Sequence, residues 1–133
     1  MRIEPHLTFR GDCEEAFRFY ARLFGGELVL LSYGSSPAAS GVPEAWRSKV
    51  VHATLALADG KTLLGADVLP DQFERPQGFY VLAAFGDDTE AQRVFDALAD
   101  GGSVRMPLQK TFWSRSFGVV VDRFGTPWEI TVE

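Results

Sequence analysis

The chain has 133 residues, which fits one domain covering residues 1–133, and its net charge of -5 with scattered basic residues argues against a nucleic-acid partner. No segment approaches the roughly 18 apolar residues of a membrane-spanning helix. Met1 to Arg10 also lacks the basic and apolar regions of a secretory signal. We therefore expect a cytoplasmic protein without a membrane partner.

The first half of the chain predicts the order strand, helix, strand, strand, strand. Asp12 and Glu15 have the spacing of a capping box, so a helix should begin there and end near Gly25-Gly26. Asp59-Gly60 predicts a hairpin turn. Alternating apolar and β-branched residues predict the strands, over 3–9, 27–33, 49–58 and 62–68. Cys13, the only cysteine, is expected to be a bystander, either packed in the core or in contact with solvent, rather than a reactive thiol.

Two segments interrupt this pattern. Residues 34–47 are rich in Ser, Ala, Pro and Gly and predict a mobile loop, for which Trp46 favours a lid. Residues 69–77 contain Pro70 and Pro76 and predict a linker. We expect the linker to join two modules.

The second half repeats the first. Without a gap, a group of residues at the start of the chain aligns with a group 75 positions later: Leu7, Gly11, Asp12, Glu15, Ala16 and Arg18 with Leu82, Gly86, Asp87, Glu90, Ala91 and Arg93. The second helix should begin at Asp87 and end near Gly101-Gly102. The predicted strands are 78–85, 103–108, 116–122 and 127–132. The sequence therefore predicts an α+β fold of two βαβββ modules, over residues 1–69 and 77–133.

Several motifs, spread over both halves in order, carry a family resemblance. They are Pro5 to Tyr20 followed by Phe24-Gly-Gly-Glu, Val51-His-Ala-Thr-Leu, Phe112-Trp-Ser-Arg-Ser-Phe-Gly and Phe124-Gly-Thr-Pro-Trp-Glu-Ile. With them the chain resembles the PhnB-like branch of the vicinal oxygen chelate superfamily, which includes glyoxalases, bleomycin-resistance proteins and dioxygenases. The resemblance implies sheets curled around a cavity and a homodimer, which would also cover exposed strand edges.

Alternation along the strands predicts which side chains face that cavity. Trp128, Ile130 and Val132 should lie under a helix, leaving Glu129 on the opposite face. The same reasoning places Val51, Ala53 and Leu55 under the other helix and His52 and Thr54 in the cavity. The full set of cavity candidates is His52, Glu129, His6, Thr54, Trp113, Tyr33 and Trp46. The three aromatic residues in this set are equally consistent with core or dimer-interface packing.

The resemblance also implies where a metal would bind. In metal-using members, a His early in the first strand of a module and a Glu in its last strand are ligands. Glu129 falls on such a Glu position, but gapless counting places Pro5 at the His position, so His6 would need a bulge at Gly11. His52 is a further candidate. The second module offers no His, and the counterpart of Glu129 in the first is Leu64.

Two classes of function stay open, and the sequence does not decide whether the protein is an enzyme. One is a binding module that encloses a small organic ligand and needs no cofactor. The other is a lyase, transferase or dioxygenase that uses a divalent metal at Glu129 with His6 or His52. We prefer the binding module because the ligand set is incomplete.

Overall fold

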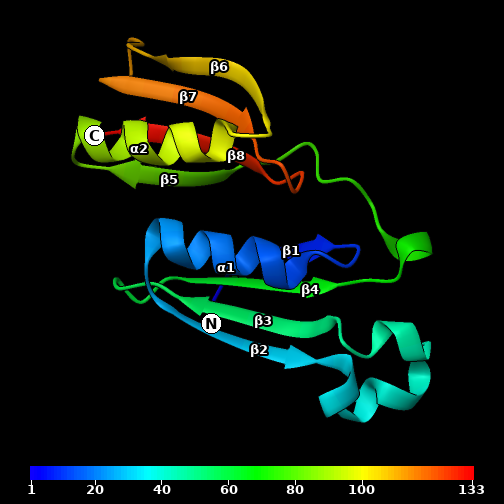
Figure 1. Cartoon of the computed structure of the whole chain (residues 1–133). Coiled ribbons are helices and arrows are strands. Elements are labelled where there is room, and N and C mark those ends of the chain that lie inside the picture. The colour runs from blue at the N-terminus through cyan, green and yellow to red at the C-terminus, as the bar shows by residue number, and fades with distance from the viewer. The chain divides into compact units, whose positions relative to one another are not determined.

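The computed structural model describes residues 1–133 as two compact units, Met1–Glu74 and Arg75–Glu133 (Figure 1). Each unit has one long helix and one four-stranded sheet. The predicted α+β fold with two βαβββ modules is therefore confirmed. No helix has both the length and the apolar character needed to cross a membrane.

The first unit has the strand order β1-β4-β3-β2, with β1 parallel to β4 and the other neighbours antiparallel. Its regular elements are β1 His6–Phe9, α1 Cys13–Phe24, β2 Glu27–Ser32, β3 Val50–Ala56 and β4 Thr62–Asp67. The predicted loop 34–47 contains short 3₁₀ helices instead of a featureless chain, and the predicted linker contains another. These are η1 Tyr33–Ser35, η2 Pro37–Gly41, η3 Glu44–Trp46 and η4 Pro70–Gln72.

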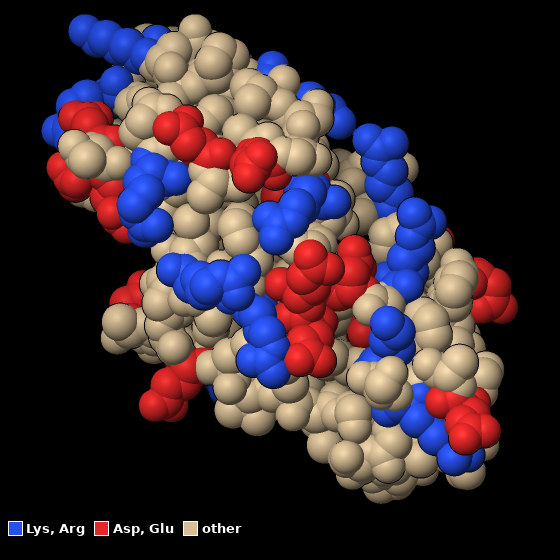
Figure 2. Space-filling model, viewed as in Figure 1, with Lys and Arg blue, Asp and Glu red and all other residues tan.

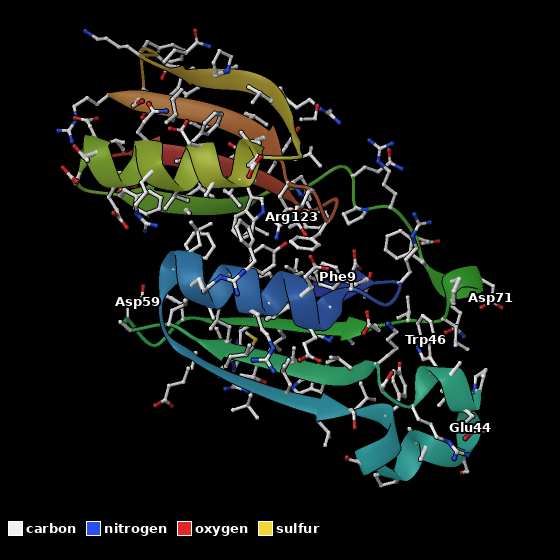
Figure 3. All side chains as sticks on the ribbon, in the orientation of Figure 1. Phe9, Glu44, Trp46, Asp59, Asp71 and Arg123 are labelled. Atoms are coloured by element: carbon white, nitrogen blue, oxygen red, sulfur yellow. The ribbon has the colours of Figure 1, made fainter.

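The second unit has the equivalent strand order, β5-β8-β7-β6. Its elements are β5 Val81–Phe85, α2 Asp88–Ala99, β6 Ser103–Gln109, β7 Ser116–Val121 and β8 Pro127–Val132. Figure 3 labels Asp59 in the β3–β4 turn and Arg123 in the β7–β8 turn. Each of these turns joins the third and fourth strands of its unit. Gly60 and Gly125 in these turns have positive φ, as the hairpin prediction requires.

Each helix packs its apolar stripe onto one face of its own sheet. The predicted stripe residues are all buried: Ala16, Tyr20 and Leu23 in α1, and Ala91, Phe95 and Leu98 in α2. Phe9 of β1, labelled in Figure 3, is also buried, and its ring contacts that of Phe17 in α1 edge to face. The helix covers only one face of its own sheet. We call the opposite face of each sheet its open face.

The first strand of each module begins later than its sequence pattern predicts, at His6 rather than Ile3 and at Val81 rather than Gly78. Ile3 is 87% exposed and has no strand beside it. Val81 pairs with Trp128, and the preceding residue of β8 is Pro127, which has no N–H to continue the ladder. Pairing partners, rather than composition, therefore set these boundaries.

The two helix starts are capped differently, and the prediction of a capping box at Asp12 is wrong. The Asp12 side chain makes no capping hydrogen bond. Asp67, from the end of β4, accepts hydrogen bonds from the N–H groups of Gly11 (2.7 Å) and Cys13 (3.0 Å) instead. In the second unit Asp87 does cap α2, because its carboxylate accepts from the Glu90 N–H at 3.0 Å.

A one-residue insertion before α1 accounts for the different capping of the two helices. Three residues separate β1 from α1, whereas two separate β5 from α2. Gly11 lies in the longer connection with φ of 122°, a region that favours glycine. The gapless alignment therefore holds for the helices but is off by one in the strands before them.

Candidate functional site

The open face of the first sheet carries three of the predicted polar residues. Ala53 and Leu55 are fully buried beneath α1, so His52 and Thr54 lie on the other face of β3, as alternation predicts. Their side chains are hydrogen bonded, with 3.1 Å between Thr54 Oγ1 and His52 Nε2. Val51 is only half-buried because a bulge where β2 meets β3 brings Val50 into the core.

His6 joins these residues on the open face. Its ring centroid lies 6.4 Å from that of His52. Partial desolvation of the His6 ring against the sheet lowers its pKa below the ordinary value, and the neighbouring charge of His52 lowers it further. Both imidazoles are exposed, so they can donate or accept hydrogen bonds at the surface of the sheet.

The open face of the second sheet is mostly apolar around one carboxylate. Trp128, Ile130 and Val132 are buried beneath α2, which places Glu129 on the opposite face of β8. Its cross-strand neighbours there are Leu82 and Val119. Glu129 is half-buried and makes no hydrogen bond or ion pair within its own unit. Its unit therefore supplies no donor for this carboxylate.

The loop before β7 closes one end of this face. Ser114 Oγ lies 2.8 Å from Thr131 Oγ1 and donates to the carbonyl of Ser116 at 2.6 Å. Trp113, which is 56% exposed, packs edge to face on Phe117 with 5.4 Å between ring centroids. Trp113 therefore borders the same face as Glu129.

Tyr33 and Trp46 lie elsewhere in the first unit, beside the β1–α1 connection. The Tyr33 hydroxyl donates to the backbone carbonyl of Asp67 at 2.6 Å, and burial raises the Tyr33 pKa. Trp46, labelled in Figure 3, is half-buried with its Nε1 unpaired, and Lys49 Nζ lies 5.9 Å from its ring centroid. These two residues do not join His6 and His52.

A pocket of about 490 Å³ lies at this connection, and sequence reasoning did not predict it. Residues in its wall include Gly11, Asp12, Glu14, Glu15, Lys49 and Asp67. Burial raises the pKa of Asp12, and it raises that of Cys13 strongly. Cys13 is fully buried, so of the two settings expected for it the structure shows the packed one.

Strand register shows which residues occupy the metal-ligand positions that the resemblance implies. His6 pairs with Leu64 in the first unit, and Leu82 pairs with Glu129 in the second. The extra residue at Gly11 brings His6 into line with Leu82, so His6 and not Pro5 holds the first-strand position. The two pairs make four ligand positions, and two of them, Leu64 and Leu82, have no atom that can bind a metal. No group of three or more His, Cys, Asp or Glu side chains in the structure is arranged to hold a metal ion.

The model of the Glyoxalase/Bleomycin resistance protein/Dioxygenase superfamily matches residues 2–130 of the chain. The chain belongs to this superfamily. The crystal structure of protein PA1353 from Pseudomonas aeruginosa is 40% identical in sequence to this chain and has a TM-score of 0.90. The match covers 100% of this chain and 98% of that chain. Protein YjdN of Escherichia coli is 33% identical over 99% of this chain and 95% of its own length.

A second solved structure supports the PhnB-like resemblance. It is a Bacillus cereus protein described as a putative 3-demethylubiquinone-9 3-methyltransferase, PhnB protein. It is 28% identical, covers 100% of both chains and has a TM-score of 0.84. The resemblance predicted from the motifs is thereby confirmed.

Proposed function

We propose that the chain binds a small organic ligand on the open faces of its sheets, in the cavity between paired modules that the family resemblance implies. The observation that carries this proposal is the large exposed apolar side chains on both faces: Val29 (66% exposed) and Leu31 (42%) in the first unit, Leu82 (55%) and Trp113 (56%) in the second. Large apolar side chains exposed together on one face of a sheet are typical of a binding site.

A few polar groups on these faces would orient the ligand. Ligand sites commonly combine apolar walls with a small number of placed donors and acceptors. Glu129 has both carboxylate oxygens available, and the imidazoles of His6 and His52 offer donor and acceptor nitrogens. We expect a ligand with a hydroxyl or amine that donates to Glu129.

A metal-dependent lyase, transferase or dioxygenase is the second candidate. The observation that favours it is the register that places His6 and Glu129 on the two polar ligand positions. A divalent metal there would polarise or chelate vicinal oxygens. Leu64 and Leu82 supply no ligand, however, so the donor set of this chain fits a metal poorly.

A titration with the neutral dye Nile red tests the binding proposal, with dye fluorescence as the readout. The wild type should bind saturably, and Leu82→Asp and Val29→Asp should each weaken binding because they place a charge on an open face. Ile3→Asp is the matched control, since Ile3 is 87% exposed but lies outside every strand. Equal binding by all three variants would refute the proposal.

Elemental analysis separates the two candidates. Protein purified without chelators should contain less than one equivalent of transition metal if the first proposal holds. A stoichiometric metal that is lost in Glu129→Gln and His6→Gln would make the metal-dependent enzyme the better explanation.

A further inference from the structure

A second pocket lies wholly within the second unit, where the chain enters β5. It has a volume of about 200 Å³, and its wall includes Arg75, Gln77, Tyr80, Arg105, Val121 and Pro127. No acidic residue lines it. In a chain with a net charge of -5, a pocket that contains two arginines and no carboxylate is a distinct electrostatic environment.

Neither arginine is neutralised within the structure. Arg75 and Arg105 form no ion pair or side-chain hydrogen bond, whereas Arg18, Arg93 and Arg115 each pair with a carboxylate. Acidic and basic side chains are interspersed over the face shown in Figure 2. Two unpaired guanidiniums beside one pocket therefore offer planar donor groups that match a carboxylate or phosphate.

Strand register connects this pocket to the open face of the second sheet. Val121 pairs with Pro127, and two residues along each strand Val119 pairs with Glu129. Residues two apart in a strand lie on the same face, about 7 Å from each other. The pocket is thus the end of the face that carries Glu129, opposite the end that Trp113 borders.

We infer that this pocket binds the carboxylate or phosphate group of an anionic small molecule whose apolar part lies on the open face of the second sheet. The inference rests on the proposed function and adds the chemical class of the ligand. The pocket is smaller than the roughly 300–1,000 Å³ of sites that enclose a whole ligand. Its volume suits one charged group, and the apolar part of the ligand could contact Leu82 and Val119.

Phenyl phosphate and benzoate are suitable probes, with benzyl alcohol as their neutral counterpart. Amide chemical shifts in ¹H–¹⁵N spectra of the full chain would report binding. We expect Gly78 and Tyr80 to shift saturably with at least one anion, and comparison of the two anions tells whether phosphate or carboxylate is preferred. Because both guanidiniums are exposed, Arg75→Gln and Arg105→Gln should each weaken anion binding by about threefold. Neither variant should change benzyl alcohol binding.

Arg22→Gln is the charge-matched control, because Arg22 is exposed at the end of α1 in the first unit. It should leave anion binding unchanged. The inference is overturned if neither anion saturates, or if all three variants bind the anions as the wild type does. If the inference is overturned but Nile red binding is still lost in Leu82→Asp, the proposed function stands without it. Conversely, arginine-dependent anion binding without shifts at Leu82 and Val119 would support the anion pocket and contradict the placement of the apolar part on the open face.

Discussion

At the scale of single residues, the Asp67 side chain connects three parts of the first unit. Its two carboxylate oxygens accept hydrogen bonds from the N–H groups of Gly11, Cys13 and Val50. One side chain therefore joins the end of β4 to the start of α1 and the start of β3. Asp67 is buried, and no local sequence pattern indicates these partners, which lie 17 to 56 residues away along the chain.

Replacing Asp67 with Asn should destabilise the protein by about 2–4 kcal/mol, because the amide has only one acceptor oxygen and places N–H groups against the backbone donors. Urea unfolding followed by circular dichroism would measure the free energy of unfolding. Asp71→Asn in η4, where the side chain is exposed, is the matched control and should change it little. Equal effects of the two substitutions would refute this role of Asp67.

His6 makes stability depend on pH in a defined direction. Its folded-state pKa is lowered, chiefly by burial, from the ordinary value of 6.5, so the folded state binds the proton less well than the unfolded state. The stability that His6 contributes is therefore present above pH 6.5 and is lost as the pH falls through its folded pKa. NMR titration should give a midpoint below 6.5, and His6→Gln should reduce the loss of stability on acidification. A midpoint at or above 6.5 would contradict this.

At the scale of elements, each unit depends on a close approach between its helix and a glycine in its sheet. A Cβ atom on Gly65 of β4 would collide with the Phe17 ring of α1. A Cβ atom on Gly118 of β7 would lie 2.7 Å from Phe95 of α2. In each unit, therefore, the aromatic ring of the helix can pack this closely only because the residue facing it in the sheet is glycine.

Gly65→Ala should lower the free energy of unfolding by about 1–3 kcal/mol, because Phe17 is fully buried and has little room to move. Gly86→Ala is the control, since no atom lies within 4 Å of the corresponding Cβ position and its φ is not positive. Thermal unfolding of both variants would test the difference. A wild-type melting temperature for Gly65→Ala would show that α1 lies farther from the sheet than described.

At the scale of the whole molecule, β2 and β6 each form one edge of their sheet, so one side of each strand has unpaired backbone groups. Exposed and half-buried side chains alternate along β2, and the side chains of β6 are largely exposed. Such edges tend to associate. We propose a homodimer, and sedimentation velocity at micromolar concentration should show a species of twice the chain mass. A single monomeric species under those conditions would rule it out. That His52 and Glu129 share one cavity likewise stays a prediction, because the two residues belong to different units.

The amino-acid sequence by itself determined the element order, the internal repeat and the family, because these depend on local periodicity, turn residues and ordered motifs. It also determined that His52, Thr54 and Glu129 lie opposite the helices, since side chains alternate along a strand. Only the tertiary structure decided the register of His6, because one inserted residue at Gly11 leaves the helix pattern intact while shifting the strand before it. The role of Asp67 and the pocket between Arg75 and Arg105 likewise depend on strands that pair across long sequence separations, which local patterns do not encode.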